Sequence, residues 1–97
     1  MTFTWDANKS ERNLRERGFD FEFAAEIMVS PVLVKVIEGK EYGEPRFIAI
    51  GETDGIVFTV IYTRRVGEDG EVVRKIISAR RASRKERSRY EKAQRQN

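Results

Sequence analysis

The sequence contains no cysteine and no histidine among its 97 residues. Without cysteine the chain cannot form a disulfide, a thiolate nucleophile, an iron–sulfur site or a zinc–thiolate cluster. Without histidine it lacks the only side chain whose charge ordinarily changes near neutral pH. These two absences exclude a Ser-His-Asp triad and the two-histidine acid–base scheme of many ribonucleases. Any catalysis must therefore use Lys, Arg, Tyr, Ser, Thr or carboxylate side chains.

Long apolar segments are missing as well. No window approaches the run of about 18 apolar residues that a membrane span needs, so we expect no membrane partner. The opening MTFTWDANKS lacks both the basic and the apolar region of a signal peptide. With 39% hydrophobic and 36% charged residues, the chain has enough apolar content for one thin core. We therefore expect a single domain over residues 1–97, located in the cytoplasm of a bacterium or archaeon.

Positive charge is concentrated toward the C-terminus. Residues 71–97 contain ten Lys/Arg and three Glu, a net charge of +7, whereas residues 1–70 contain nine Lys/Arg and thirteen Asp/Glu, a net charge of −4. This asymmetry favours an anionic partner for the C-terminal third. A helix whose charges only face water would give the same composition, so that alternative stays open.

The first thirty residues predict one short strand and two helices. TFTW (2–5) alternates like an edge strand, and Asp6 suits the N-cap of the polar helix that follows. Gly18 lies just beyond the end of that helix, and Asp20 suits the N-cap of a second helix. Ser30-Pro31 ends the second helix, because a residue before proline avoids the helical conformation.

Beyond residue 31 the hydrophobic period changes from helical to alternating. Four predicted strands rich in β-branched and aromatic residues follow, at residues 32–37, 46–50, 56–65 and 72–79. Gly-containing turns separate them. Ser83 and Glu86 form a capping box, which predicts a C-terminal helix. The expected fold is α+β, an antiparallel four-stranded meander plus the short N-terminal strand. Two N-terminal helices and one C-terminal helix should pack on one side of this sheet.

Arginines near the ends of the predicted strands are candidates for phosphate contacts: Arg46, Arg64, Arg65, Arg80 and Arg81. The planar guanidinium makes bidentate contacts with phosphate and stabilises the charge that develops on a phosphorane. Strand alternation puts Arg64 and Arg65 on opposite faces, and it groups Arg80 with Ser78 and Ile76. Which of these arginines converge in space stays open.

Two aromatic residues could complete such a site. Tyr62 and Trp5 are candidates for stacking on an exposed base, which is how single-stranded RNA is commonly held. The alternative makes Tyr62 a core ring and Trp5 the residue that packs the first helix on the sheet. The sequence leaves both alternatives open.

The predicted C-terminal helix adds further basic residues: Arg84, Lys85, Arg87, Arg89, Lys92 and Arg95. Its least basic face is a narrow and weakly apolar stripe that contributes little burial free energy. Such a helix could detach as a lid, or a partner chain could complete its packing. With Trp5 and Arg64, we count Arg84 and Lys85 as RNA-binding candidates.

Three segments together resemble a known family: FTWDANKSERNLRERGFDFEFAAEIM, GEPRFIAIGETDGIVFTVIYT and IISARRASRKERSRYE. They cover most of the chain in the right order, and the closing segment is the most specific of the three. In these segments the sequence resembles the BrnT-type toxins of bacterial type II toxin–antitoxin pairs.

The resemblance implies a RelE-like α+β fold and a ribonuclease toxin that cuts RNA without a metal or other cofactor, inhibiting translation and growth. It also implies a BrnA-like antitoxin that binds DNA. The toxin itself would be associated with DNA only indirectly, through this antitoxin. The site residues carried over by position are Trp5, Lys9, Arg46, Tyr62, Arg65, Arg80 and Arg81. The implied reaction is attack of a 2′-hydroxyl on the adjacent phosphate. Arginines would stabilise the phosphorane, and Lys9 or Glu44 would accept the proton.

Two positions depart from the family's pattern. Family members commonly have Lys-His-Gly where this chain has Glu16-Arg17-Gly18, and an acidic residue is frequent at the position of Arg64. We expect Arg17 to replace the histidine by contacting the last carbonyls of the first helix. Two other classes of function fit the same residues. One is a module that binds RNA or the antitoxin without cleavage, and the other is a basic helix that serves as a protein-interaction element.

Overall fold

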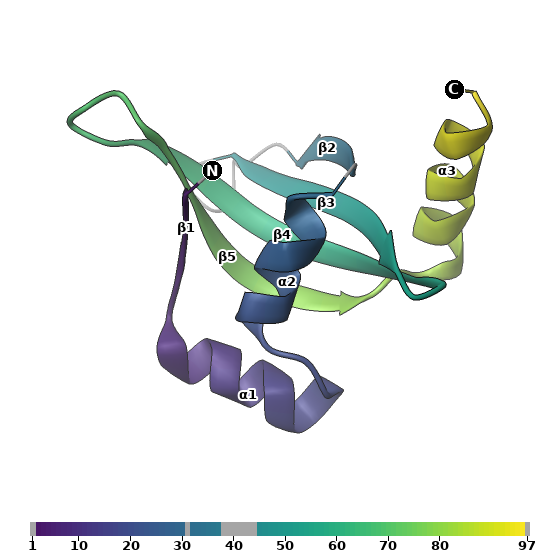
Figure 1. The fold of residues 1–97 in the computed structure, drawn as a ribbon, viewed down its shortest axis with the longest axis horizontal. Coiled ribbons are helices and arrows are strands. Elements are labelled where there is room, and N and C mark those ends of the chain that lie inside the picture. The colour runs from purple at the N-terminus through teal and green to yellow at the C-terminus, as the bar shows by residue number, and fades with distance from the viewer. Residues whose placement is uncertain (1, 31, 38–44, 97) are drawn as a thin grey trace.

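The computed structural model describes residues 2–30, 32–37 and 45–96. Its elements follow the predicted order, with these bounds: β1 (Thr2–Trp5), α1 (Ala7–Arg17), α2 (Phe21–Met28), β2 (Leu33–Ile37), β3 (Arg46–Thr53), β4 (Ile56–Val66), β5 (Val72–Arg81) and α3 (Arg84–Arg95). Figure 1 shows the strands as one twisted sheet, crossed by α2 and flanked by α3. The predicted α+β class is confirmed. The predicted turn between β2 and β3, with Glu44, lies outside the described residues.

Local sequence signals determine where α1 and α2 begin and end. The carboxylate of Asp6 accepts hydrogen bonds from the backbone N–H groups of Asn8 and Lys9, at 2.8 and 3.1 Å. Asp20 caps α2 in the same way. Gly18 follows α1 with φ of 89°, a left-handed conformation that glycine adopts without strain. The predicted caps are therefore confirmed.

The sheet has the strand order β1-β5-β4-β3-β2. The strands β2 to β5 are antiparallel neighbours in sequence order, joined between β3 and β4 by Asp54-Gly55 with positive φ at both residues. The strand β1 pairs with β5 in parallel, so the sheet is five-stranded and mixed. The parallel pairing was not predicted, because turn signals specify direction only for strands that a short turn connects.

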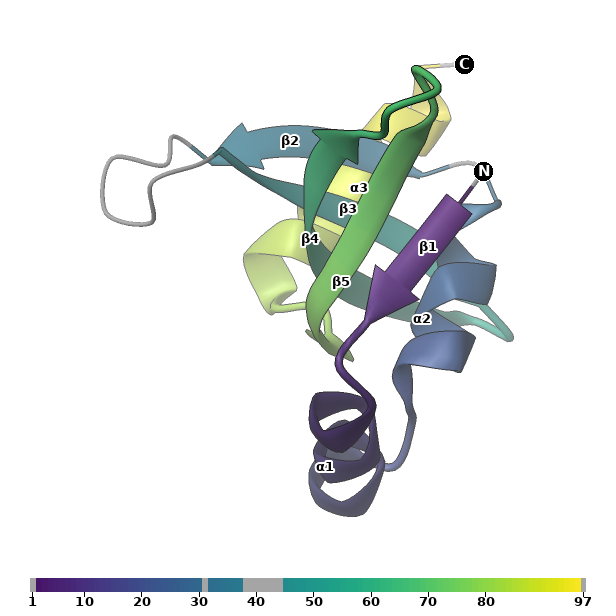
Figure 2. The ribbon, with the colours of Figure 1, turned by 90° about the vertical axis from the view of Figure 1, so that its left-hand side faces the viewer.

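The helices lie on both faces of the sheet, as Figure 2 shows. On one face, which we call the α2 face, Phe21 and Ala24 of α2 pack in a core cluster with Val60 and Ile76. On the opposite α3 face, Tyr90 of α3 packs with smaller apolar residues of β3 and β4. The prediction that all helices share one side is wrong. A stripe as narrow as that of α3 needs only a small apolar site, and the α3 face provides it.

The pairing of β4 with β5 contains a β-bulge. Tyr62 pairs with Ile76, whereas the residue before Tyr62 pairs with Ser78, so Ile77 is an extra residue in β5. The bulge reverses the alternation on its N-terminal side. Ile76 therefore lies on the α2 face and Ser78 on the α3 face, which corrects the strict alternation expected from the sequence.

Candidate functional site

Three basic side chains surround Thr63 on the α3 face. Thr63 pairs directly with Lys75 of β5, and Arg46 lies beside it because the adjacent residues of β3 and β4 are paired. Arg65 follows two residues along β4 on the same face. Given the spacing of strands and of alternate residues, the three Cα atoms lie within about 10 Å of one another. We call Arg46, Arg65 and Lys75 the basic cluster.

The residue at the centre of the basic cluster is itself unusual. Thr63 is only 2% exposed, and its hydroxyl has no hydrogen-bond partner among the described residues. A buried hydroxyl without a partner costs stability. The observation adds polar character to a face that already carries three cations.

Lys9 lies in the first turn of α1, beside β5. The pKa of the Asp6 carboxyl is lowered, mainly by hydrogen bonds from backbone N–H groups at the start of α1 and also by the charges of Lys9 and Lys75. Lys9 also lines a cavity of about 250 Å³ between α1 and β5, together with Arg17. Of the residues predicted from sequence, the structure therefore brings Arg46 and Arg65 together. Lys9 is linked to Lys75 only through Asp6, on which the charges of both lysines act.

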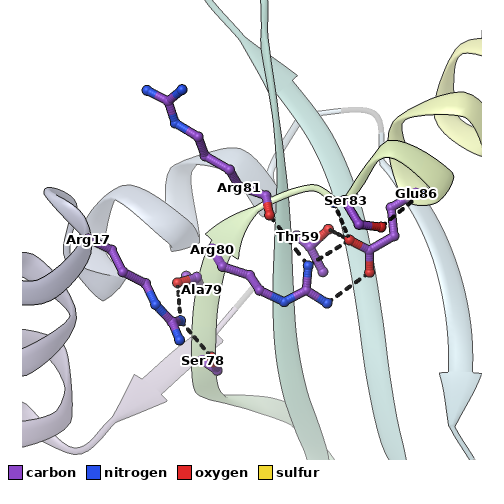
Figure 3. A network of polar contacts seen from close by, with 8 residues as sticks. All are labelled: Arg17, Thr59, Ser78, Ala79, Arg80, Arg81, Ser83 and Glu86. Atoms are coloured by element: carbon purple, nitrogen blue, oxygen red, sulfur yellow. Dashed lines mark hydrogen bonds and ion pairs between the residues drawn. The ribbon is translucent and has the colours of Figure 1, made fainter.

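Arg80 is engaged in an ion pair that holds α3 on the sheet. Its guanidinium donates to both carboxylate oxygens of Glu86, Nη1 to Oε1 at 2.6 Å and Nη2 to Oε2 at 2.9 Å. Glu86 also accepts hydrogen bonds from the Thr59 hydroxyl and the Ser83 backbone N–H, at 3.0 and 2.8 Å. These contacts, with Arg80 the largest contributor, lower the pKa of Glu86 to about 2. Figure 3 shows the network.

Arg81 lies on the other face from Arg80. It pairs with Phe58, and it lines a cavity of about 500 Å³ on the α2 face together with Phe19, Phe23 and Arg17. In Figure 3 the two arginine side chains extend in different directions. The strand-to-helix corner therefore does not present Arg80 and Arg81 as a pair to one phosphate.

The two aromatic candidates both lie on the α2 face. Tyr62 is 4% exposed and stacks on Phe47 with ring centroids 5.4 Å apart. The guanidinium of Arg64 lies 4.0 Å above the Phe47 ring. Trp5 is partly buried against the same core cluster. These positions support the packing alternative for both rings, and neither ring lies on the face of the basic cluster.

The first turn of α3 contains the two RNA-binding candidates Arg84 and Lys85. Only Lys85 adds positive charge to the cavity on the α3 face. Lys85 lines a cavity of about 260 Å³ between α3 and the sheet, with Lys35 and Arg89. Arg84 is exposed at the start of the helix and lines none of the cavities described above. The cavity is thus bordered by three basic side chains and extends the positive α3 face beyond the basic cluster.

Arg17 does not contact the last carbonyls of α1, which corrects the prediction for this position. Its guanidinium donates to the Ala79 carbonyl at 2.8 Å and to the Ser78 hydroxyl at 3.2 Å. β1 pairs only with residues 73–76 of β5, and Arg17 hydrogen-bonds the Ala79 carbonyl farther along β5, beyond the end of that pairing. Its role is to join α1 to the sheet.

Sequence reasoning missed Lys75, Lys35 and Arg89 as members of the positive face. Lys75 was hidden by the bulge, because strict alternation back from Arg81 assigns it to the α2 face. Lys35 could have been found from its strand, since it pairs with Ile48 on the face that also carries Arg46. Arg89 was noted as a basic residue of the C-terminal helix but was not assigned to this face, since α3 was expected on the other side of the sheet.

Two further observations concern metal binding and membrane spans. Among the described residues, no group of three or more Asp, Glu, His or Cys side chains is placed to hold a metal ion. None of the helices in residues 2–30 and 45–96 is long and apolar enough to cross a membrane.

A cluster of basic residues on one face of the sheet of a small α+β protein is the charge pattern typical of proteins that bind polyanions such as RNA. Comparison with known families is more specific. The family described as "Ribonuclease toxin, BrnT, of type II toxin-antitoxin system" matches residues 5–86. The chain therefore belongs to the BrnT family of ribonuclease toxins, as its resemblance in sequence indicated. A search among curated proteins gave no match.

Proposed function

We propose that this BrnT-family chain cleaves RNA on its α3 face, with the basic cluster as the phosphate-binding centre. The observation that carries the proposal is the grouping of Arg46, Arg65 and Lys75 around Thr63 on adjacent strands. Rigid strands hold cations at fixed spacing, which is the arrangement that stabilises charge developing on a transferring phosphate.

The proposed step is attack of the ribose 2′-oxygen on the adjacent phosphorus. The 2′-hydroxyl loses its proton, the new O–P bond forms, and the bond to the 5′-oxygen breaks as that oxygen takes up a proton. The products are a 2′,3′-cyclic phosphate and a 5′-hydroxyl end. Arg46 and Arg65 stabilise the charge on the phosphorane oxygens, and Lys9 is the proposed proton acceptor at the edge of the cluster.

Within this proposal the other predicted residues take supporting roles. Arg80 is a positioning residue, because its ion pair with Glu86 holds α3 and so keeps Lys85 on the α3 face. Tyr62 stabilises the core beneath the site. Arg81, Arg84, Arg64 and Trp5 lie away from the basic cluster, and we assign them no contact with the reacting phosphate.

The proposal extends to the cellular role. We propose that cleavage needs no metal ion, inhibits translation in the cytoplasm, and is neutralised by a BrnA-like DNA-binding antitoxin. We also propose that the fold is RelE-like. Support comes from membership of the family and from the positive face, which provides phosphate-binding groups within the chain itself.

Incubating the purified chain with cellular RNA, with and without EDTA, tests the proposed function. We expect cleavage in both samples, with 2′,3′-cyclic phosphate ends detected by their resistance to 3′-end ligation and to phosphatase alone. Ligation should become possible only after dilute acid opens the ring and a phosphatase then removes the phosphate. Intact RNA in both samples would refute ribonuclease activity for this chain, and cleavage abolished by EDTA would refute metal independence.

A second function, RNA binding without cleavage, is favoured by one observation. The ion pair with Glu86 occupies Arg80 through both terminal nitrogens, so one predicted cation is already neutralised. This alternative predicts RNA affinity that falls steeply with salt, because bound phosphates release counterions, but no cleavage products.

A further inference from the structure

The strand β2 forms one edge of the sheet. It pairs with β3 on one side, and among the described residues no strand pairs with its other side. An edge of this kind presents a row of backbone donors and acceptors to which another strand can add. Native proteins usually protect such edges with proline, charge or a covering helix.

Among the residues that the structure describes, little protects the edge strand β2. On the α2 face, Val34 and Val36 are 49% and 54% exposed, because α2 packs over β3, β4 and β5. They pair with Ala49 and Phe47, so they extend the apolar core surface to the edge. The only charged residue of β2 is Lys35, which lies on the α3 face.

We propose that β2 accepts an added antiparallel strand from a protein partner whose sequence alternates apolar, acidic and apolar residues. The apolar residues would lie opposite Val34 and Val36, and the acidic residue opposite Lys35, because residues paired across antiparallel strands share a face. Backbone hydrogen bonds would supply the affinity, and the side-chain contacts of Val34, Lys35 and Val36 would supply the specificity.

Charge distinguishes this partner from a second copy of the chain. Antiparallel self-pairing that uses all five residues of β2 places Lys35 directly opposite the Lys35 of the second copy. Like charges at that position are destabilising. An acidic residue converts the same contact into a favourable one.

The position of the added strand has a consequence for the α3 face. Lys35 borders the cavity beneath α3 and lies on the same face as Arg46. An acidic residue opposite Lys35 would therefore bring negative charge toward the positive α3 face, on which we propose that RNA binds. The natural source of such a strand is the antitoxin, and this assignment of the source rests on the proposed function.

The test uses two synthetic peptides that differ only in their central residue, acetyl-Thr-Val-Glu-Val-Thr-amide and acetyl-Thr-Val-Lys-Val-Thr-amide. Each is titrated to about 5 mM against the full chain labelled with 15N, and amide shifts and hydrogen exchange are recorded. We expect changes centred on alternate amides of β2, and about two- to fivefold tighter binding of the Glu peptide. The variant Lys35→Glu should reverse this preference.

A matched pair of variants tests the apolar contacts. The double variant Val34→Thr/Val36→Thr keeps β-branched residues and should weaken both peptides about threefold or more. Val66→Thr is the control, because Val66 is 72% exposed but lies on β4 away from the edge. It should leave binding unchanged.

Several results would overturn the proposal. These are no change at β2 up to the highest concentration, changes confined to the basic cluster, or a preference that Lys35→Glu leaves unaltered. A dimer in sedimentation that the double valine variant abolishes would make a second copy the occupant instead. The titration needs no RNA cleavage, so an inactive chain that binds the Glu peptide refutes only the proposed function.

Discussion

Replacing Glu86 with Gln should show how much the ion pair with Arg80 stabilises the fold. Gln keeps the length and the carbonyl oxygen of Glu86, so it can still accept the Ser83 N–H, and the substitution removes mainly the charge. The pKa of Glu86 is about 2 against an ordinary value of 4.5. At about 1.36 kcal/mol per pKa unit, the charge stabilises the fold by at most about 3 kcal/mol.

Exposure reduces that upper limit. The Arg80 side chain is 36% exposed, so water screens the pair, and we expect Glu86→Gln to cost about 1–2 kcal/mol at pH 7. Urea unfolding followed by circular dichroism measures this as a midpoint lower by about 1 M. The control is Glu11→Gln, whose pair with Arg15 is long and mostly exposed. It should cost no more than about 0.5 kcal/mol.

The pH dependence of the Glu86→Gln effect provides an independent check. The folded pKa of Glu86 is lower than its unfolded value, so its stabilisation is fully present above pH 4.5 and disappears as the pH falls to about 2. The difference between the wild type and the variant should therefore vanish near pH 2. A loss no larger than that of Glu11→Gln, or a loss equal at both pH values, would refute the reasoning.

Three further substitutions test other parts of the structure. Gly51→Ala should lower stability by about 1–3 kcal/mol in thermal unfolding, because its Cβ would lie 2.9 Å from the Ile27 Cγ2; an unchanged transition would contradict the close packing. Tyr62→Phe should leave RNA cleavage within about twofold, since the ring is buried, and a hundredfold loss would restore a catalytic role for its hydroxyl. Arg17→Gln should cost about 1–2 kcal/mol in urea unfolding through the lost hydrogen bond to the Ala79 carbonyl, and equal stability would show that the edge contact is unimportant.

Local structure could be predicted from the sequence because each signal acts over a few residues. The side chains of Asp6 and Asp20 cap the helices that follow them, and Asp54-Gly55 adopts the hairpin turn expected of that dipeptide. Alternation along β4 was also correct, with Arg64 and Arg65 on opposite faces. These features depend on neighbours in the chain rather than on tertiary packing.

The candidate site could be predicted only in part, because it depends on pairings between distant segments. The bulge at Ile77 moves Lys75 onto the α3 face, and no residue type in β5 signals an inserted residue. The sequence predicted Glu86 only as the capping-box residue of the C-terminal helix. Its ion pair with Arg80 was therefore not predicted. Arg80 and Arg81 were both candidates for phosphate contacts, and the sequence did not show that Arg80 pairs with Glu86.

The most direct test of the central claim compares two adjacent arginines of β4. Arg65→Gln removes a cation of the basic cluster, whereas Arg64→Gln removes the same charge from the opposite face, where it lies over Phe47. We predict that kcat/KM for RNA cleavage falls about a hundredfold in the Arg65 variant and stays within about threefold in the Arg64 variant, both being folded by thermal unfolding. Equal losses, or a greater loss for Arg64→Gln, would contradict the account.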